Sequence, residues 1–402
     1  MLSNAKLPTR VGTLAFLASA AVVLAGCGGD GSSADETATE SAPAGGDAAA
    51  IAASEAEQAQ AGEQGPFAVG HRTITVTDDS RDGRTFEADI WYPSDPSATA
   101  GVNPTEYSFL PGLGYTSKIS FADAPAAEGE FPLLVYSHGG GGFRWVATFF
   151  TEFMASQGYV VIAPDHPGST ALDQLSGAGV DEQTNAFERP ADITATIDAA
   201  LAADADTADP LAGRIDDRLI ALSGHSWGGY TSLATVAGHT NSLGATTTDP
   251  RVKALVLMAP YTEMLSDEEL AQVDVPTFVV SSTGDTSTPI ESNTERPVSL
   301  IEGRPLLRVD IQGGSHNSFT DVCKLRDAVA GNTNLPEAVK AELARGSQDA
   351  CDPAALSVEV VADITNSYAN AFLAREMTGT DEFDEMLNCV APPADAVCTV
   401  IE

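Results

Sequence analysis

The sequence predicts an α/β fold, with a mostly parallel central sheet, helices on both faces and an antiparallel hairpin at the N-terminal side. Short apolar runs of strand length recur from residue 131 onward, and segments with helical periodicity separate them. Glycine-rich turns follow several of these runs directly. Strands buried on both faces and connected through helices produce this alternation.

The elements follow in order along the chain. The hairpin is predicted over residues 71–77 and 84–92, where β-branched and aromatic residues flank the turn sequence Asp-Asp-Ser-Arg-Asp-Gly. Residues 93–130 and 165–186 are predicted as loops. Residues 93–130 and 165–184 are candidates for the substrate pocket, and the alternative is that the aromatic residues of the first loop only cover the core. The buried strands are predicted over residues 131–136, 158–163, 218–222, 252–258, 275–281 and 304–311. The helices are predicted over about residues 143–157, 190–203, 227–238 and 356–377.

Composition limits the possible partners. The chain has 402 residues, of which 43% are hydrophobic, so it is long and apolar enough for a large folded core. The 57 acidic residues outnumber the 20 basic ones and give a formal net charge of −37. We expect no nucleic-acid partner, because phosphate binding needs basic patches. Neutral or zwitterionic substrates should approach such a surface more easily than anionic ones.

The first 26 residues predict a signal peptide. Lys6 and Arg10 precede an apolar run over residues 11–25 that is too short to span a membrane. The sequence Leu-Ala-Gly-Cys at residues 24–27 resembles a bacterial lipobox, which implies lipidation of Cys27 and cleavage before it. An ordinary secretory signal with an incidental cysteine is the alternative. The resemblance implies an exported protein anchored by lipid to the outer face of a bacterial membrane.

Two further regions follow. Residues 28–65 contain eight acids, no Lys or Arg and no aromatic residue, so we predict that residues 27–65 are the lipidated cysteine and a disordered acidic tether. A marginal helix over residues 47–61 is the alternative. Residues 66–402 are predicted as a single domain, with a cysteine-containing helical extension over about residues 320–402.

Four cysteines lie in the last eighty residues and predict disulfide bonds, because an exported chain with an even number of cysteines favours them. We expect the sequence-local pairs Cys323–Cys351 and Cys389–Cys398 among the three connectivities that are possible. A metal site is not predicted, because there is no Cys-x-x-Cys motif and no histidine within a few residues of any of them. No cofactor is predicted either.

Ser226 is the candidate nucleophile. It lies in Gly-His-Ser-Trp-Gly at residues 224–228, a G-x-S-x-G motif between an apolar run and a helix that begins with small residues. A sharp strand-to-helix turn strains the serine backbone and projects its hydroxyl over the edge of the sheet. The adjacent His225 is predicted to pack in the turn rather than to act as a base.

A serine hydroxyl needs an imidazole that accepts its proton, and His316 is the candidate. Only His239 and His316 follow Ser226 in the chain. His239 ends the helix after the motif and is predicted to face away from the site. His316 lies in a glycine-rich turn after a strand, so a loop can bring it beside the serine.

The acid of the triad is expected after a strand between the serine and the histidine, and Asp285 fits this position. It would hold the imidazole in one tautomer and stabilise its protonated form. An Asx-turn at a strand end is the structural alternative. Glu263 and Asp310 are the competing carboxylates.

Residues 137–142, Ser-His-Gly-Gly-Gly-Gly, predict an oxyanion loop after an earlier strand. We expect the backbone N–H groups of Gly140 and Trp227 to donate to the tetrahedral oxyanion, since glycine lets the backbone approach the substrate closely. A phosphate-binding loop is excluded, because the lysine and Ser/Thr of that motif are missing. His138 is expected to support the loop.

Four stretches together resemble the α/β-hydrolase branch that holds platelet-activating-factor acetylhydrolases and dienelactone-hydrolase-like esterases. They lie at residues 132–144, 155–168, 189–193 and 224–229. The resemblance covers about residues 66–320. It implies an α/β-hydrolase fold and ester hydrolysis through an acyl-enzyme without cofactor or calcium dependence, and it supports Gly140 as a donor.

The position of the acid departs from the eukaryotic acetylhydrolases. The strand after the nucleophile ends in Leu-Met-Ala-Pro at residues 257–260, without a carboxylate. Asp285 comes one strand later and resembles the arrangement of bacterial cutinases and polyester hydrolases.

The sequence therefore predicts a lipid-anchored extracytoplasmic serine hydrolase of carboxylic esters, acting on lipid-like or short-acyl esters. A polyester or cutin-type hydrolase with the same triad is one alternative. A catalytically silent cell-surface binding protein is an alternative of another class. The expected partners are a small-molecule or polymeric ester and, through the lipid anchor, a membrane.

Overall fold

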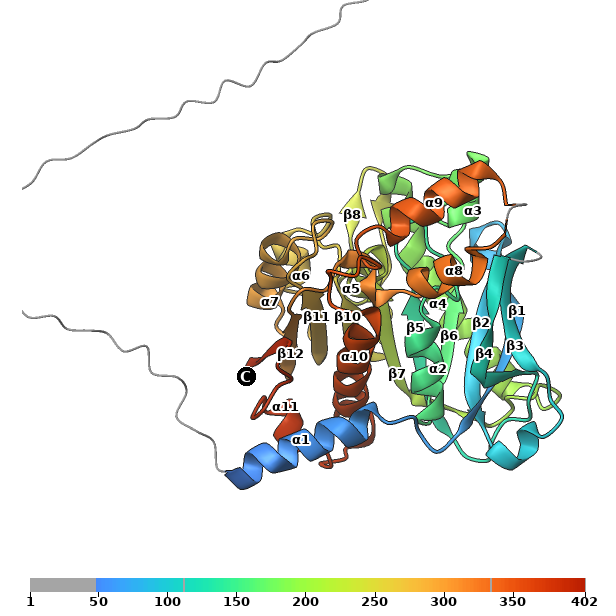
Figure 1. The fold of residues 1–402 in the computed structure, drawn as a ribbon. Coiled ribbons are helices and arrows are strands. Elements are labelled where there is room, and N and C mark those ends of the chain that lie inside the picture. The colour runs from blue at the N-terminus through green and yellow to red at the C-terminus, as the bar shows by residue number, and fades with distance from the viewer. Residues whose placement is uncertain (1–47, 111–112, 333–334, 402) are drawn as a thin grey trace, which may run out of the picture. The chain divides into compact units, whose positions relative to one another are not determined.

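The computed structural model describes residues 48–110, 113–332 and 335–401. Eleven strands form one sheet in the order β13-β12-β11-β10-β7-β5-β6-β2-β1-β4-β3 (Figure 1). The strands span Ala68–Asp78 (β1), Arg84–Ser94 (β2), Pro104–Leu110 (β3), Leu113–Ala122 (β4), Phe131–Ser137 (β5), Val160–Pro164 (β6), Ile215–His225 (β7), Val252–Met258 (β10), Thr277–Ser282 (β11), Leu306–Ile311 (β12) and Ala396–Ile401 (β13). Thr240–Asn241 (β8) and Gly244–Ala245 (β9) pair separately.

The centre of the sheet is parallel, as predicted. The neighbours from β6 through β5, β7, β10 and β11 to β12 all pair in parallel. β1 and β2 form the predicted antiparallel hairpin, and β2 joins β6 antiparallel. β13 adds an antiparallel strand beyond β12 that the sequence analysis does not predict.

Helices cover both faces of the sheet (Figure 1). They span Ala48–Gly62 (α1), Thr148–Ser156 (α2), Ala171–Ser176 (α3), Glu182–Ala205 (α4), Trp227–Ala237 (α5), Asp267–Leu270 (α6), Arg296–Leu300 (α7), Val322–Val329 (α8), Glu337–Ser347 (α9), Val358–Leu373 (α10) and Asp384–Leu387 (α11). None of these described helices is long and apolar enough to span a bilayer.

The hydrophobic core has one layer on each side of the sheet. All of β5 is buried, and its alternate side chains enter different layers. Leu134 packs in the layer that includes α2 and α10, whereas Leu133 packs in the layer that includes α4 and α5. Burial on both faces explains why the central strands are continuous apolar runs.

The two segments predicted as loops contain regular structure, and these predictions are corrected. Residues 104–110 and 113–122 form β3 and β4, which add to the sheet beside β1. Residues 171–176 form α3, and α4 begins at Glu182, eight residues before the predicted start, with Asp181 as its N-cap. Pro190 lies inside α4, and the sequence analysis took it as the helix start.

The tether prediction is also corrected over residues 48–62, which form α1. This helix packs against α10 and α11. Ala61 is completely buried, and its carbonyl accepts a hydrogen bond from Asn370 Nδ2 at 3.1 Å. The Glu57 carboxylate accepts one from the backbone N–H of Met386 at 2.8 Å. Residues 1–47, with the predicted signal peptide and Cys27, lie outside the described residues.

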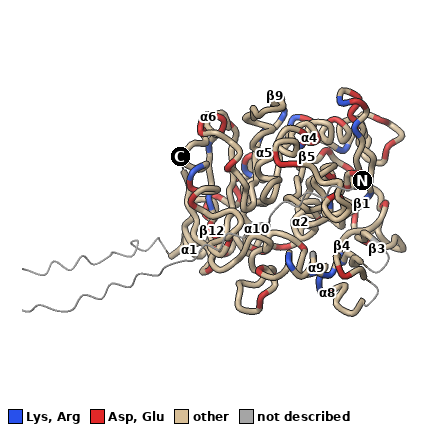
Figure 2. Tube along the Cα trace, turned by 90° about the horizontal axis from the view of Figure 1, so that it is seen from above, with Lys and Arg blue, Asp and Glu red and all other residues tan. Residues whose placement is uncertain are grey.

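Charged residues are distributed over many elements. Figure 2 shows acidic positions around the whole periphery of the described trace, with fewer basic positions between them. The acidic positions are therefore distributed over many parts of the described trace and are not gathered in one segment.

Candidate active site

Ser226 lies at the sharp turn between β7 and α5. Its backbone has φ 56° and ψ −117°, in a region that residues other than glycine rarely adopt. Its N–H donates to the carbonyl of Met258 at 3.0 Å, and its own carbonyl accepts from the N–H of Tyr261 at 2.9 Å. These bonds to β10 and the loop after it hold the strained residue in place.

Glycine is required on both sides of the turn. A Cβ on Gly224 would lie 2.3 Å from the carbonyl carbon of Gly228. A Cβ on Gly228 would lie 1.8 Å from the carbonyl oxygen of Ser137. The motif spacing thus reflects close backbone contact between the turn, the start of α5 and the end of β5.

The structure brings Ser226, His316 and Asp285 together from three different loops. Ser226 Oγ lies 2.9 Å from His316 Nε2, and His316 Nδ1 lies 2.7 Å from Asp285 Oδ2. His316 begins a short turn of 3₁₀ helix after β12, and Asp285 follows β11. The geometry fits a serine that donates to a neutral imidazole and an imidazole that donates to a carboxylate.

Asp285 is held by groups that the sequence analysis did not identify. The N–H groups of Ser287 and Thr288 donate to its Oδ1 at 2.8 and 2.9 Å, and Thr288 Oγ1 donates to Oδ2 at 2.7 Å. Burial raises the pKa of Asp285, but the hydrogen bonds from His316 and Thr288 outweigh this effect and hold the pKa below its ordinary value. Asp285 therefore forms the Asx-turn that was the structural alternative, and the same carboxylate also contacts the imidazole.

The competing carboxylates have other partners. Asp310 pairs with Arg308 at 2.7 Å within β12. Glu263 Oε1 accepts a hydrogen bond from Ser292 Oγ at 3.2 Å. Among the described residues, neither carboxylate forms a hydrogen bond or ion pair with His316.

The other histidines near the motif have structural contacts. His239 Nδ1 lies 3.2 Å from Glu269 Oε2, at the far end of α5. His225 Nε2 donates to the carbonyl of His316 at 2.9 Å and so steadies the loop that carries the candidate base. Burial and the neighbouring His316 lower the pKa of His225 to about 3, so it stays neutral near pH 7.

The predicted oxyanion loop lies against the nucleophile turn. A Cβ on Gly139 would lie 3.4 Å from Ser226 Cβ, and one on Gly140 would lie 3.0 Å from Trp227 Cδ1. The structure therefore places Gly140 beside Trp227, the first residue of α5. The role of their N–H groups as oxyanion donors stays a prediction.

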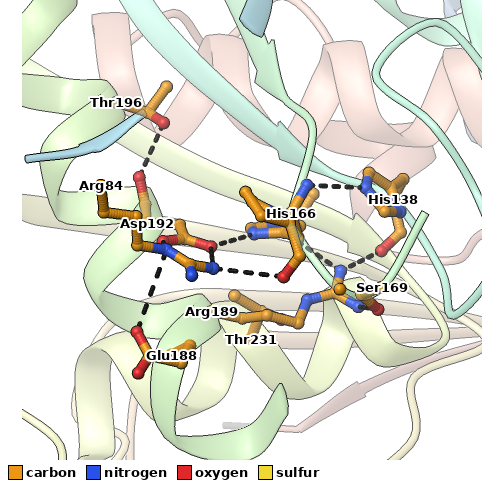
Figure 3. Close-up of polar contacts among 12 residues, drawn as sticks. Arg84, His138, His166, Ser169, Glu188, Arg189, Asp192, Thr196 and Thr231 are labelled. Atoms are coloured by element: carbon orange, nitrogen blue, oxygen red, sulfur yellow. Dashed lines mark hydrogen bonds and ion pairs between the residues drawn. The ribbon is translucent and has the colours of Figure 1, made fainter. Parts of the chain in front are cut away.

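A buried polar network holds His138, at the start of this loop (Figure 3). Arg189 donates to the carbonyl oxygen of His138 and, at 3.2 Å, to the hydroxyls of Ser137 and Ser169. The N–H of His166 donates to His138 Nε2 at 3.2 Å. Arg189 is 1% exposed. Nothing in the sequence pattern shows that these residues meet, because they come from β5, the loop after β6 and α4.

His166 and Asp192 complete the network. His166 Nε2 lies 2.9 Å from Ser137 Oγ, and His166 Nδ1 lies 3.1 Å from Asp192 Oδ2. Burial and the nearby Arg189 lower the pKa of His166 to about 3. Burial opposes ionisation of Asp192, but hydrogen bonds from His166 and Arg84 lower its pKa to about 2. The network therefore combines a neutral imidazole with an ionised carboxylate.

A pocket of about 760 Å³ opens above Ser226 and His316. Its apolar wall residues come from the β3–β4 hairpin, α3, α8 and α9, and include Phe109, Leu113, Leu172, Leu175, Leu325, Val339 and Leu343. Residues from both predicted loop regions line this pocket, as the sequence analysis expects. The part played by α8 and α9 was not predicted.

The structure joins Cys323 to Cys351 and Cys389 to Cys398. Cys323 lies in α8, and Cys351 follows α9, so the first bond closes the segment that forms one wall of the pocket. Within the described ranges, no group of three or more His, Cys, Asp or Glu residues is arranged to hold a metal ion.

Comparisons with known proteins agree with this architecture. A model of the "Alpha/beta hydrolase family" matches residues 133–396. A bis(hydroxyethyl) terephthalate hydrolase of Streptomyces coelicolor is 25% identical over 194 residues, which are 48% of this chain and 53% of that protein. The chain thus spans about half the length of that curated relative. A ferulic acid esterase structure from Streptomyces cinnamoneus has a TM-score of 0.59 and 21% identity, covering 84% of this chain and 97% of the other, and shows the fold alone.

Proposed function

The chain belongs to the alpha/beta hydrolase family, and on this basis we propose that it hydrolyses carboxylic esters through a covalent acyl-serine. The observation that carries the proposal is the hydrogen-bonded chain from Ser226 through His316 to Asp285 at the floor of a pocket. In this arrangement the Ser226 hydroxyl can pass its proton to His316 while its oxygen attacks the ester carbonyl.

Ser226 Oγ attacks the ester carbonyl while His316 Nε2 accepts its proton. Asp285 keeps the imidazole oriented and stabilises its positive charge. The N–H groups of Gly140 and Trp227 donate to the oxyanion of the tetrahedral intermediate. His316 then gives the proton to the departing alcohol. In the second half of the reaction, water attacks the acyl-serine while His316 accepts its proton, and His316 returns that proton to Ser226 as the acid leaves.

The apolar pocket wall favours esters with an apolar acid or alcohol. Lipid-like or short-acyl esters, as in the acetylhydrolase branch, fit this chemistry. A second candidate is a polyester-type substrate, which the relative from Streptomyces coelicolor favours because that protein is a hydrolase of a terephthalate ester. An aromatic diester of that kind is neutral, in keeping with the net charge of −37 on this chain.

We further propose that Cys27 carries a lipid and anchors the enzyme to the outer face of a bacterial membrane. The support is the signal-like run before Leu-Ala-Gly-Cys at residues 24–27. Replacement of Cys27 by serine should move the protein from the membrane fraction to the soluble fraction. Retention of the Cys27→Ser chain in the membrane would contradict the anchor.

A fluorophosphonate probe tests the catalytic proposal, because it reacts with an activated serine. The wild type should be labelled and should cleave p-nitrophenyl acetate, short-acyl phospholipid or bis(hydroxyethyl) terephthalate, whereas Ser226→Ala should do neither. An unlabelled wild type that cleaves no ester would support the silent binding protein instead. Equal labelling of Ser226→Ala would exclude Ser226 as the nucleophile.

A further inference from the structure

The segment around α3 exposes large apolar side chains at one place on the surface. Five large hydrophobic side chains are exposed in the described part of the chain, and three of them are Leu172, Leu175 and Val180. Their exposed fractions are 52%, 41% and 40%. Single exposed leucines are common on protein surfaces, but a cluster beside a pocket indicates contact with an apolar ligand.

Leu172 and Leu175 belong to the wall of the active-site pocket. They are separated by three positions on α3, so they lie on the same helix face. Both line the pocket that also contains Ser226 and His316. α3 and α9 lie at the same end of the sheet (Figure 1). The leucines therefore extend the apolar wall from the reacting serine out to solvent.

The segment around α3 is held together by hydrogen bonds among its own residues. Thr170 and Asp173 form a reciprocal cap at the start of α3. The Asp173 carboxylate also accepts from the N–H of Gly168 at 2.8 Å. The N–H of Val180 donates to the carbonyl of Gly168 at 2.9 Å and closes the segment on itself. Its backbone bonds are satisfied locally, so it does not need to bury its leucines to be ordered.

The same segment is bonded to the oxyanion loop. The N–H of Gly141 donates to the carbonyl of Ser169 at 2.9 Å, and the N–H of Ala171 donates to the carbonyl of Gly142 at 3.0 Å. A ligand that rests on α3 is thus held at a fixed position relative to Gly140. This is the arrangement that positions a scissile ester by means of its distant, unreactive part.

We propose that Leu172 and Leu175 form a docking strip for the unreactive part of a neutral, extended apolar ester, such as a segment of an aliphatic or aromatic polyester. The proposal rests on the proposed esterase function. Two features argue for a neutral chain rather than an anionic lipid surface. The strip continues directly into the pocket, and the net charge of −37 opposes approach to an anionic bilayer.

The strip is tested with the full-length double variant Leu172→Gln/Leu175→Gln, since glutamine preserves helix propensity. The matched control is Leu243→Gln, because Leu243 is 53% exposed between β8 and β9 and does not line the pocket. The readout is the ratio of kcat/KM for p-nitrophenyl dodecanoate to that for p-nitrophenyl acetate. The double variant should lower this ratio about tenfold through KM, and the control should leave it unchanged. An unchanged ratio in the double variant would overturn the proposal.

A binding measurement separates the strip from the esterase function. In the Ser226→Ala background, the chain should adsorb to polycaprolactone particles, and the two leucine substitutions should weaken that adsorption several-fold. This result stands even if the wild type hydrolyses no ester. Leucine-dependent binding to phosphatidylglycerol vesicles, without such binding to polycaprolactone, would overturn the strip in favour of a membrane contact.

Discussion

Two buried histidines make the free energy of unfolding depend on pH between 7 and 5. Burial, with Arg189 beside His166 and His316 beside His225, lowers the pKa of both imidazoles to about 3. In the unfolded chain each imidazole has its ordinary pKa of about 6.5. Below that pH the unfolded chain takes up protons that the folded chain does not. The folded state therefore loses stability as the pH falls, down to about pH 3 where the folded imidazoles titrate.

The size of this loss follows from the shifts. Each pH unit below the unfolded pKa costs about 1.4 kcal/mol per imidazole, so each histidine removes about 2 kcal/mol between pH 7 and pH 5. His166 and His225 together remove about 4 kcal/mol, which is a large part of the stability of an ordinary domain. Burial also places the pKa of His138 well below its ordinary value, and its contribution has the same sign.

Urea unfolding at pH 7, 6 and 5, followed by tryptophan fluorescence with the disulfides intact, measures the effect. His225→Gln should reduce the loss between pH 7 and pH 5 by about 2 kcal/mol relative to the wild type. Leu243→Gln, a substitution at an exposed position, should keep the wild-type pH dependence. Equal losses in the wild type and His225→Gln would refute the reasoning that His225 is buried as a neutral imidazole.

Three further predictions concern the site and its supports. Asp285→Asn should lower kcat for p-nitrophenyl acetate by about 10³- to 10⁴-fold with little change in KM, since the imidazole loses the carboxylate that orients it; a loss under about tenfold would contradict this role. Arg189→Met should lower kcat for the same ester about 10- to 100-fold while KM stays nearly constant, because the carbonyl of His138 loses its donor and the predicted oxyanion loop shifts. An unchanged kcat would exclude Arg189 as a positioning residue. Removing the Cys323–Cys351 bond by double serine substitution should lower the free energy of urea unfolding by about 3–4 kcal/mol, because the bond closes a span of 28 residues; an unchanged midpoint would show that the pocket wall folds without it.

Local pattern was sufficient to select the candidate triad. Ser226, Asp285 and His316 each follow a strand that is recognisable as an apolar run. β7, β11 and β12 are parallel members of one sheet, so the loops after them meet at the same edge. Once the order of strands and helices predicts a parallel sheet, the convergence of these three residues follows from topology.

Residues whose role depends on tertiary contact could not be found in this way. α1 contains no aromatic residue and many alanines, so composition predicts a tether, and an isolated helix of 15 residues is marginal in water. Its order comes from α10 and α11, which lie more than 290 residues later in the sequence. The role of Arg189 is hidden for the same reason. The residues around it predict a helix, but they do not indicate that its guanidinium donates to the carbonyl of His138.

The described part of the chain holds a second Ser–His–Asp array besides that of Ser226, and their comparison shows what makes one of them a candidate catalyst. Ser137, His166 and Asp192 form contacts of 2.9 and 3.1 Å, close to the 2.9 and 2.7 Å of the array at Ser226. Ser137 and His166 are completely buried, and Ser137 ends a regular strand. Ser226 instead has a strained backbone and lines a pocket beside His316. Residue types and hydrogen bonds are thus shared by both arrays. Access to a pocket is what favours the proposed nucleophile role for Ser226 and a supporting role for the buried array beneath the predicted oxyanion loop.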